Sequence, residues 1–190
     1  TRLQGDWSSD VCSSDLLLPH HLHCKYAVAA LESGVHVLTE KPIGISVEDA
    51  DLMIAASKKS KKQLGVIYQN RYIEGVQQVR NLIQDGTLGA VKGALSTLAW
   101  HRPASYYQCD WKGRWETEGG GVVIDQAIHS IDLVRYMTGL DAIQVQGYIA
   151  RRVLKSIEVE DVANAAITLE NGAIYSFFAC NYYTKNSPIR

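Results

Sequence analysis

Helical and strand-like patterns alternate along the first third of the chain, and this alternation constrains the fold more than any other feature. Gly34 follows the first helical pattern as a C-terminal stop, and Ser46 precedes the second as an N-cap. The two helical and two β-branched, apolar segments are, in chain order, residues 20–33, 35–39, 47–59 and 64–68. Helix, strand, helix, strand at this spacing predicts part of a doubly wound parallel sheet, in which ligands bind beyond the carboxyl ends of the strands.

The pattern changes after residue 72. One more helix is followed by several longer strand-like segments and by a hairpin turn at residues 170–172. The helix is expected over residues 73–84, and the strands over residues 91–101, 142–153, 162–169 and 173–182. This order predicts an α+β unit with a mostly antiparallel open sheet, so the fold class of the whole chain is α/β plus α+β.

A glycine loop at residues 119–121 leads into an amphipathic helix that ends at Gly139. Asp125 and His129 lie four residues apart, so they share one face of this helix, just after a loop without side chains. A carboxylate and an imidazole in this arrangement are typical of a reaction site. A buried histidine satisfied by its helical neighbour Asp125 explains the same pattern equally well.

A lysine follows the first predicted strand. Lys41 stands between Glu40 and Pro42, and the proline keeps the lysine backbone extended, so the ammonium group leaves a stiff turn. Such a lysine at the mouth of a sheet can stabilise a developing alkoxide. A surface lysine after a strand is the alternative.

Composition excludes several classes of function. The 190 residues carry 19 Lys and Arg against 20 Asp and Glu, so the sequence does not predict a nucleic-acid-binding protein. No apolar run approaches the roughly 20 residues that span a bilayer. The four cysteines lack C-x-x-C spacing and are typical of reduced thiols in a cytoplasmic protein.

Residues 1–15 repeat Ser-Ser-Asp without a hydrophobic period, which we interpret as an atypical, foreign or mistranslated leader, with a flexible polar N-terminus as the alternative.

Five segments together resemble the glucose-fructose oxidoreductase / inositol dehydrogenase / MocA (Gfo/Idh/MocA) family of NAD(P)-dependent oxidoreductases. They are residues 19–23, 29–38, 40–42, 69–72 and 119–132, in register with the family. The resemblance implies that residues 16–72 are the C-terminal portion of a nucleotide-binding Rossmann domain. Residues 73–190 would form an incomplete substrate-binding and oligomerisation domain. It further implies NAD or NADP as cofactor, a secondary alcohol of a sugar, inositol or related polyol as substrate, and a homo-oligomer.

The same resemblance implies roles for individual residues. His129 would take the hydroxyl proton, Lys41 would stabilise the charge on the same oxygen, and Asp125 would orient both substrate and imidazole. Which of Lys41 and His129 carries the proton stays open, because coupled groups titrate as a pair. Along the cofactor would lie Pro19, His20, His23, Glu40, Lys41, Pro42 and Asn70. The substrate would contact Arg71, Trp111, Arg114, Asp125 and His129, and no metal is implied.

Departures from the family pattern keep two other interpretations open. No G-x-G-x-x-G turn appears in the chain, and the leader takes the place of the strand expected before Pro19. A truncated, non-catalytic fragment or binding module is therefore the main alternative. A metal-dependent hydrolase or lyase is a second one, with ligands drawn from His20, His21, His23, Asp125 and His129.

Overall fold

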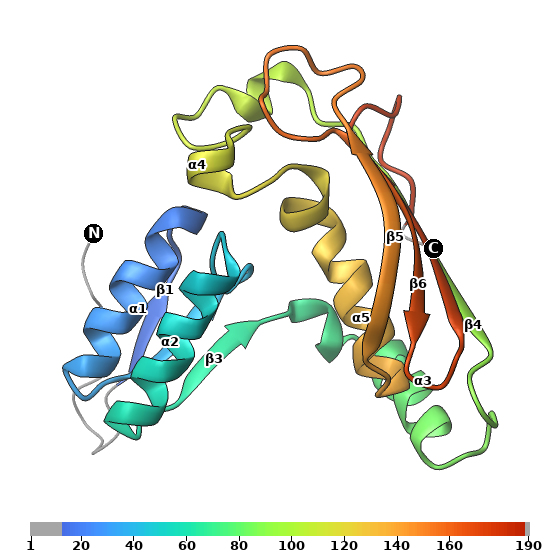
Figure 1. Ribbon diagram of the computed structural model, residues 1–190, viewed down its shortest axis with the longest axis horizontal. Coiled ribbons are helices and arrows are strands. Elements are labelled where there is room, and N and C mark those ends of the chain that lie inside the picture. Colours follow the sequence, from blue (N-terminus) through green and yellow to red (C-terminus); the bar gives the residue numbers. More distant parts are fainter. Residues whose placement is uncertain (1–12, 189–190) are drawn as a thin grey trace. The chain divides into compact units, whose positions relative to one another are not determined.

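The computed structural model describes residues 13–188, which divide into two compact units (Figure 1). Unit 1 runs through Ile67 and also contains Glu116–Gly119. Unit 2 contains Tyr68–Trp115 and the described residues from Gly120 onward. The division falls a few residues before the domain boundary expected at residue 72. Within residues 13–188, no helix has the length and apolar character needed to cross a bilayer.

Unit 1 is built on a three-stranded parallel sheet with the order β1-β2-β3. Its core contains the fully buried side chains of Leu31 on the first helix and Met53 on the second. The elements are β1 (Ser13–Leu16), the 3-10 turn η1 (His20–Leu22), α1 (His23–Glu32), β2 (His36–Glu40), α2 (Val47–Ser60) and β3 (Leu64–Ile67). The predicted parallel sheet is confirmed, because all three strands run in the same direction.

Both predicted helix boundaries in unit 1 are confirmed by their backbone geometry. Gly34 follows α1 with a φ of +83°, a conformation that glycine adopts without a steric penalty. Ser46 Oγ accepts a hydrogen bond of 3.0 Å from the Asp49 N–H, which satisfies one of the unpaired donors at the start of α2. The sequence alone was sufficient to predict these two helix boundaries, because each depends only on residues close in sequence.

The strand before Pro19 is present, which corrects the expectation that the leader replaces it. Residues 13–16 form β1 and pair in parallel with β2, Asp15 opposite Leu38. Strand pairing depends on backbone hydrogen bonds, so a short edge strand needs no alternating apolar pattern. Leu16, which is 7% exposed, anchors β1 in the core. The rest of the predicted leader, residues 1–12, lies outside the described residues.

Unit 2 contains a four-stranded sheet with the order β4-β7-β6-β5, covered on one face by α5 (Figure 1). Both pairings of β6 are antiparallel and the β4–β7 pairing is parallel, which confirms a mostly antiparallel sheet. The remaining elements are η2 (Gln69–Tyr72), α3 (Glu74–Gln84), β4 (Gly93–Ala99), η3 (Ala104–Tyr107), α4 (Trp115–Glu118), η4 (Val123–Ala127), α5 (Ile128–Thr138), β5 (Ala142–Ala150), β6 (Val162–Leu169) and β7 (Ile174–Cys180).

The helix after the glycine loop differs from the single α-helix that its periodicity predicts. Its first part, η4, is a π-helical turn that contains Asp125, and the α-helix proper, α5, begins at Ile128 and contains His129. Gly139 ends α5 with a φ of +71°, as predicted. A π turn adds one residue to each hydrogen-bonded ring, and such turns are frequent at functional sites.

Gly121 is required because the backbone before β6 passes directly against it. A Cβ at position 121 would lie 1.9 Å from the carbonyl oxygen of Glu160, a distance that no side chain tolerates. The buried Glu160 carboxylate also accepts hydrogen bonds from the N–H groups of Gly121 (2.9 Å) and Val123 (3.1 Å). The glycine loop therefore lets a buried acid satisfy the start of the helix.

We expect Gly121→Ala to lower the free energy of unfolding of unit 2 by more than about 3 kcal/mol, because the backbone must move to admit the methyl group. Gly75→Ala is the matched control, since a Cβ there meets nothing within 4 Å and α3 should gain about 0.5 kcal/mol. Urea titration followed by tryptophan emission checks this, because the tryptophans within residues 13–188 all belong to unit 2. Equal stability of the two variants would contradict the steric argument.

Candidate functional site

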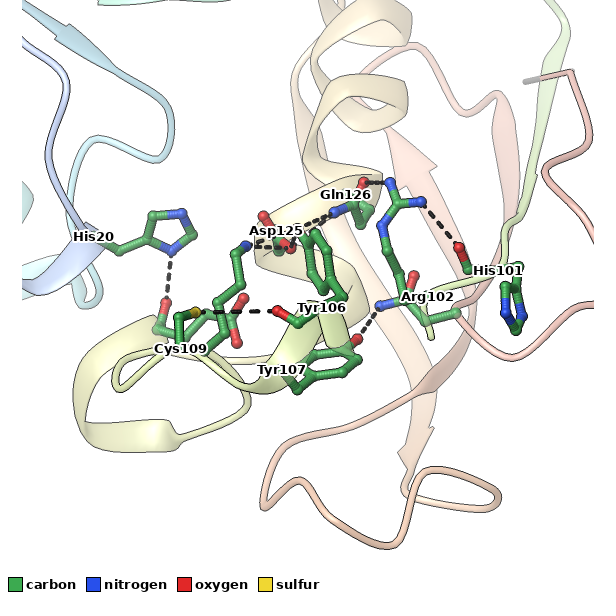
Figure 2. Close-up of polar contacts among 11 residues, drawn as sticks. His20, His101, Arg102, Tyr106, Tyr107, Cys109, Asp125 and Gln126 are labelled. Carbon is green, nitrogen blue, oxygen red and sulfur yellow. Dashed lines mark hydrogen bonds and ion pairs between the residues drawn. The ribbon is translucent and has the colours of Figure 1, made fainter. Parts of the chain in front are cut away.

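Asp125 is the centre of a buried hydrogen-bond network in unit 2 (Figure 2). Its Oδ2 atom accepts hydrogen bonds from the Tyr106 hydroxyl (2.7 Å), Lys112 Nζ (3.1 Å) and Gln126 Nε2 (2.8 Å). Asp125 is 5% exposed, so its carboxylate is held almost entirely by protein groups. The Lys112 ammonium supplies the balancing positive charge, and the Lys112 side chain is itself only 13% exposed.

The donors around Asp125 also bind one another. Tyr106 Oη accepts hydrogen bonds from Lys112 Nζ (2.7 Å) and Gln126 Nε2 (2.9 Å), and Arg102 Nη2 donates to Gln126 Oε1 at 2.7 Å. The Lys112 Nζ atom also lies 4.5 Å from the centre of the Trp111 ring. Because each group fixes the next, the position of the Asp125 carboxylate is determined before any ligand binds.

Burial raises the pKa of the Tyr106 phenol, and the negative charge of Asp125 raises it further. Lys112 opposes this shift, because its ammonium favours the ionised phenol. The net direction is upward, so Tyr106 acts in this network as a neutral donor to Asp125.

His129 lies near the start of α5 and is 8% exposed. Its ring meets the ring of Tyr68 edge to face, with 6.3 Å between the two centroids. Asp125, in η4, and His129, in α5, belong to one continuous helical segment, and their sharing of one face stays a prediction.

Arg71, a predicted substrate contact, forms an ion pair inside unit 2. Its Nε donates to Asp132 Oδ2 at 2.8 Å and its Nη2 donates to Asp132 Oδ1, an arrangement in which the guanidinium fork matches the carboxylate. The guanidinium also lies 5.0 Å from the ring centres of both Tyr68 and Tyr136. These contacts fix Arg71 between η2 and α5, and its role in substrate binding stays a prediction.

Lys41 directly follows β2 in unit 1, at the carboxyl edge of the parallel sheet. The Lys41–Pro42 peptide bond is cis, and the Lys41 N–H donates to Glu40 Oε2 at 3.3 Å. Trp111 is half-buried and Arg114 is exposed, both in unit 2. Pro19, in unit 1, and Asn70, in unit 2, are both half-buried.

The three histidines at the start of α1 bind backbone carbonyl oxygens. His20 Nδ1 donates to the Glu118 oxygen (3.0 Å) and His21 Nδ1 to the Thr117 oxygen (3.1 Å), while both ring nitrogens of His23 meet carbonyl oxygens. Among residues 13–188, no group of three or more His, Cys, Asp or Glu side chains is arranged to hold a metal ion. The ligand set of the metal-dependent alternative is therefore not assembled in the part of the chain that the structure describes.

Four residues of the Asp125 network were not among the predicted site residues. They are Arg102, Tyr106, Lys112 and Gln126. Gln126 adjoins Asp125, and Lys112 lies between two predicted residues, Trp111 and Arg114. No periodic pattern marks residues 101–112, so only the position of Lys112 within the tryptophan-rich segment could have signalled it.

Two family models match the chain. Residues 10–68 match the oxidoreductase family with an NAD-binding Rossmann fold, and residues 76–190 match the GFO/IDH/MocA C-terminal domain. In unit 1, Lys41 stands at the carboxyl edge of the parallel sheet, which is the edge where folds of this kind bind ligands.

Similar proteins include enzymes that act on sugars. Levoglucosan dehydrogenase of Pseudarthrobacter phenanthrenivorans is 27% identical over 97% of this chain and 55% of its own length. The 1,5-anhydro-D-fructose reductase of Ensifer adhaerens is 27% identical over 92% of this chain and 51% of its own length. The crystal structure of the WlbA dehydrogenase from Bordetella pertussis with NADH and UDP-GlcNAcA matches with a TM-score of 0.84 and 30% identity, covering 94% of this chain and 51% of that one. The chain thus spans about half the length of these relatives.

We expect Lys112→Met to lower the free energy of unfolding of unit 2 by about 3 kcal/mol, because it leaves the buried Asp125 carboxylate without its counter-charge. Adding Asp125→Asn should restore part of the loss, since the uncompensated charge is then removed. Arg135→Met is the control, because the Arg135–Asp141 pair is exposed (67% and 60%) and should contribute at most about 1 kcal/mol. Urea titration measures the free energy of unfolding of each variant. If the losses of the two single variants simply add in the double variant, the proposed interaction between Lys112 and Asp125 is contradicted.

Tyr106 should make stability depend on alkaline pH. Because its folded pKa is raised, its contribution is fully present below the unfolded value of about 10 and is lost as the pH rises through the folded value. Tyr106→Phe should therefore be less stable at neutral pH but lose stability less steeply above about pH 10. Urea midpoints across this range test the prediction, and parallel pH profiles for the two proteins would refute it.

Proposed function

We propose that this chain, which belongs to the GFO/IDH/MocA family of oxidoreductases, supplies the nicotinamide and substrate side of an NAD(P)-dependent dehydrogenase. The proposed reaction is reversible oxidation of a secondary alcohol on a sugar, inositol or related polyol. The single observation that carries the proposal is Lys41 at the carboxyl edge of a parallel sheet, in a segment that matches an NAD-binding family. The sugar substrates named for the relatives support the substrate class.

In this mechanism the oxidised nicotinamide cofactor, when bound, supplies the hydride acceptor. His129 takes the hydroxyl proton, because a neutral imidazole is a competent base near neutral pH. Lys41 donates a hydrogen bond to the same oxygen and stabilises its negative charge as it forms.

Asp125 would orient the substrate and His129. Its carboxylate suits this role because three donors hold Oδ2, which limits rotation of the side chain. The Lys112 ammonium lies 3.1 Å from Oδ2 and favours a charged carboxylate, which is the form that accepts hydrogen bonds from substrate hydroxyl groups. Preorganisation of this kind lowers the cost of aligning a substrate.

We also propose self-association through the sheet of unit 2. The edge strand β5 is exposed along Ala142–Ile149, and large apolar residues on it are more than half exposed: Ile143, Val145, Tyr148 and Ile149. An edge strand of this composition is a surface for pairing.

Cys24, Cys109 and Cys180 are free thiols, which supports a cytoplasmic location.

A non-catalytic binding module is the second candidate. The observation that favours it is the absence of a G-x-G-x-x-G turn from the sequence, since that turn lets the backbone approach a pyrophosphate in dinucleotide-binding folds. The two candidates differ in one measurable property, which is the affinity of the chain for a dinucleotide.

We expect NADH or NADPH to bind the chain weakly, because the sequence lacks the G-x-G-x-x-G turn that lets the backbone approach the pyrophosphate. Nicotinamide fluorescence during titration of each cofactor into the purified chain measures this. Lys41→Ala should weaken this binding, whereas the control Lys25→Ala should not, because Lys25 is exposed on α1 of the same unit. A chain that binds neither cofactor would favour the non-catalytic candidate.

In an active form of the enzyme that also carries the phosphate-binding turn, Lys41→Ala and His129→Ala should each reduce kcat at least about a hundredfold. The reason is that each removes a group that acts on the reacting oxygen. Circular dichroism should confirm that both variants fold. Near-normal turnover in either folded variant would show that its assigned role is wrong.

A further inference from the structure

His23 is fully buried on the first turn of α1, and both of its ring nitrogens meet carbonyl oxygens. Nδ1 lies 2.7 Å from the Pro42 oxygen and Nε2 lies 2.8 Å from the Leu18 oxygen. A backbone carbonyl oxygen only accepts hydrogen bonds, and a neutral imidazole has a proton on only one nitrogen. Both contacts are hydrogen bonds at the same time only when both nitrogens carry a proton.

We propose that His23 is a doubly protonated clamp that fixes the corner carrying Lys41. It is a positioning residue, which acts through the backbone of Pro42 and not by contact with cofactor or substrate. The importance of this corner for catalysis rests on the proposed function of Lys41. The clamp itself depends only on the geometry of unit 1.

The clamp joins two chain segments that leave the same edge of the sheet. Leu18 follows β1 and Pro42 follows β2, and these strands are parallel neighbours. One ring therefore connects the exits of two adjacent strands to the start of α1. Lys41 is bonded directly to Pro42, so restraint of the Pro42 carbonyl limits the directions in which the lysine side chain can leave the backbone.

A buried positive charge costs free energy, and the contacts of His23 offset this cost. Hydrogen bonds from a charged donor are roughly twice as strong as neutral ones, and His23 donates two of them. The titratable groups on the elements packed around it include His20 of η1, with ring centroids 6.0 Å apart, and Cys24 of α1. On α2, Asp49 hydrogen-bonds the Cys24 thiol, whose pKa is raised first by burial and then by the Asp49 charge. Glu40 and Lys41 belong to the corner itself.

Nitrogen-15 NMR of the imidazole ring tests the protonation state in the unmodified chain. From the two carbonyl contacts we expect protons on both ring nitrogens of His23, a signature that a histidine merely packed in a core does not give. His23→Gln provides the assignment, because its spectrum lacks these signals. A His23 ring with one unprotonated nitrogen would overturn the proposal.

Hydrogen exchange tests the effect on the corner. In His23→Gln, the amides of Lys41 and Ile43 should exchange about tenfold faster than in the unmodified chain, because at least one buried hydrogen bond is lost. Leu31→Ala is the matched control, since Leu31 is fully buried on the same helix but is not among the residues bonded to the corner. The exchange rates of the Lys41 and Ile43 amides are compared in the two variants under conditions where both have lost the same thermal stability. An equal increase in these rates in both variants would overturn the positioning role.

These two measurements are independent of cofactor and turnover. If the chain binds no dinucleotide but the ring is doubly protonated and the corner exchanges as expected, the proposed function fails and the clamp stands. If the cofactor binds but His23 is neutral, the clamp fails and the proposed function stands.

Discussion

The buried carboxylate of Glu160 is the contact on which the arrangement of unit 2 depends. This carboxylate accepts hydrogen bonds from the N–H groups of Gly121 and Val123. The Val122 N–H donates to the backbone carbonyl oxygen of Glu160 at 3.0 Å. Three consecutive amides at the start of the helical segment are thereby satisfied by one residue ahead of β6. The segment that carries Asp125 and His129 begins at this point, so the position of both side chains follows from it.

Asp161, the next residue, also has a buried carboxylate that accepts hydrogen bonds from backbone N–H groups, here those of another loop. It is fully buried, and its carboxylate accepts hydrogen bonds of 2.7 Å from the N–H groups of Arg152, Val153 and Leu154. Backbone amides are satisfactory partners for a buried anion because their dipoles are already fixed. Adjacent acids thus organise two different loops, and neither needs a charged side chain as a partner.

Both units hold their polar groups in place before any ligand arrives, but by different means. In unit 2, side chains surround Asp125: Lys112 supplies charge, and Tyr106 and Gln126 supply neutral donors. In unit 1, the corner after β2 is held through backbone carbonyls, which His23 binds. Rigid support of this kind is what a reacting group requires, because small displacements weaken an aligned hydrogen bond steeply.

The sequence by itself determined the features that depend on neighbouring residues. These are the alternating elements of unit 1, the caps at Ser46, Gly34 and Gly139, and the mostly antiparallel sheet. Periodicity and capping act over a few residues, so a single sequence reveals them. The quoted motifs also led to the family that the comparisons show.

Only the tertiary structure decided which distant groups meet. The pairs Arg71–Asp132, Lys112–Asp125 and Gly121–Glu160 join residues that no period or motif connects, and the π turn at η4 and the strand β1 also escaped the sequence pattern. Their partners are chosen by the folded backbone, because a buried charge or amide must find a partner wherever the packed chain offers one.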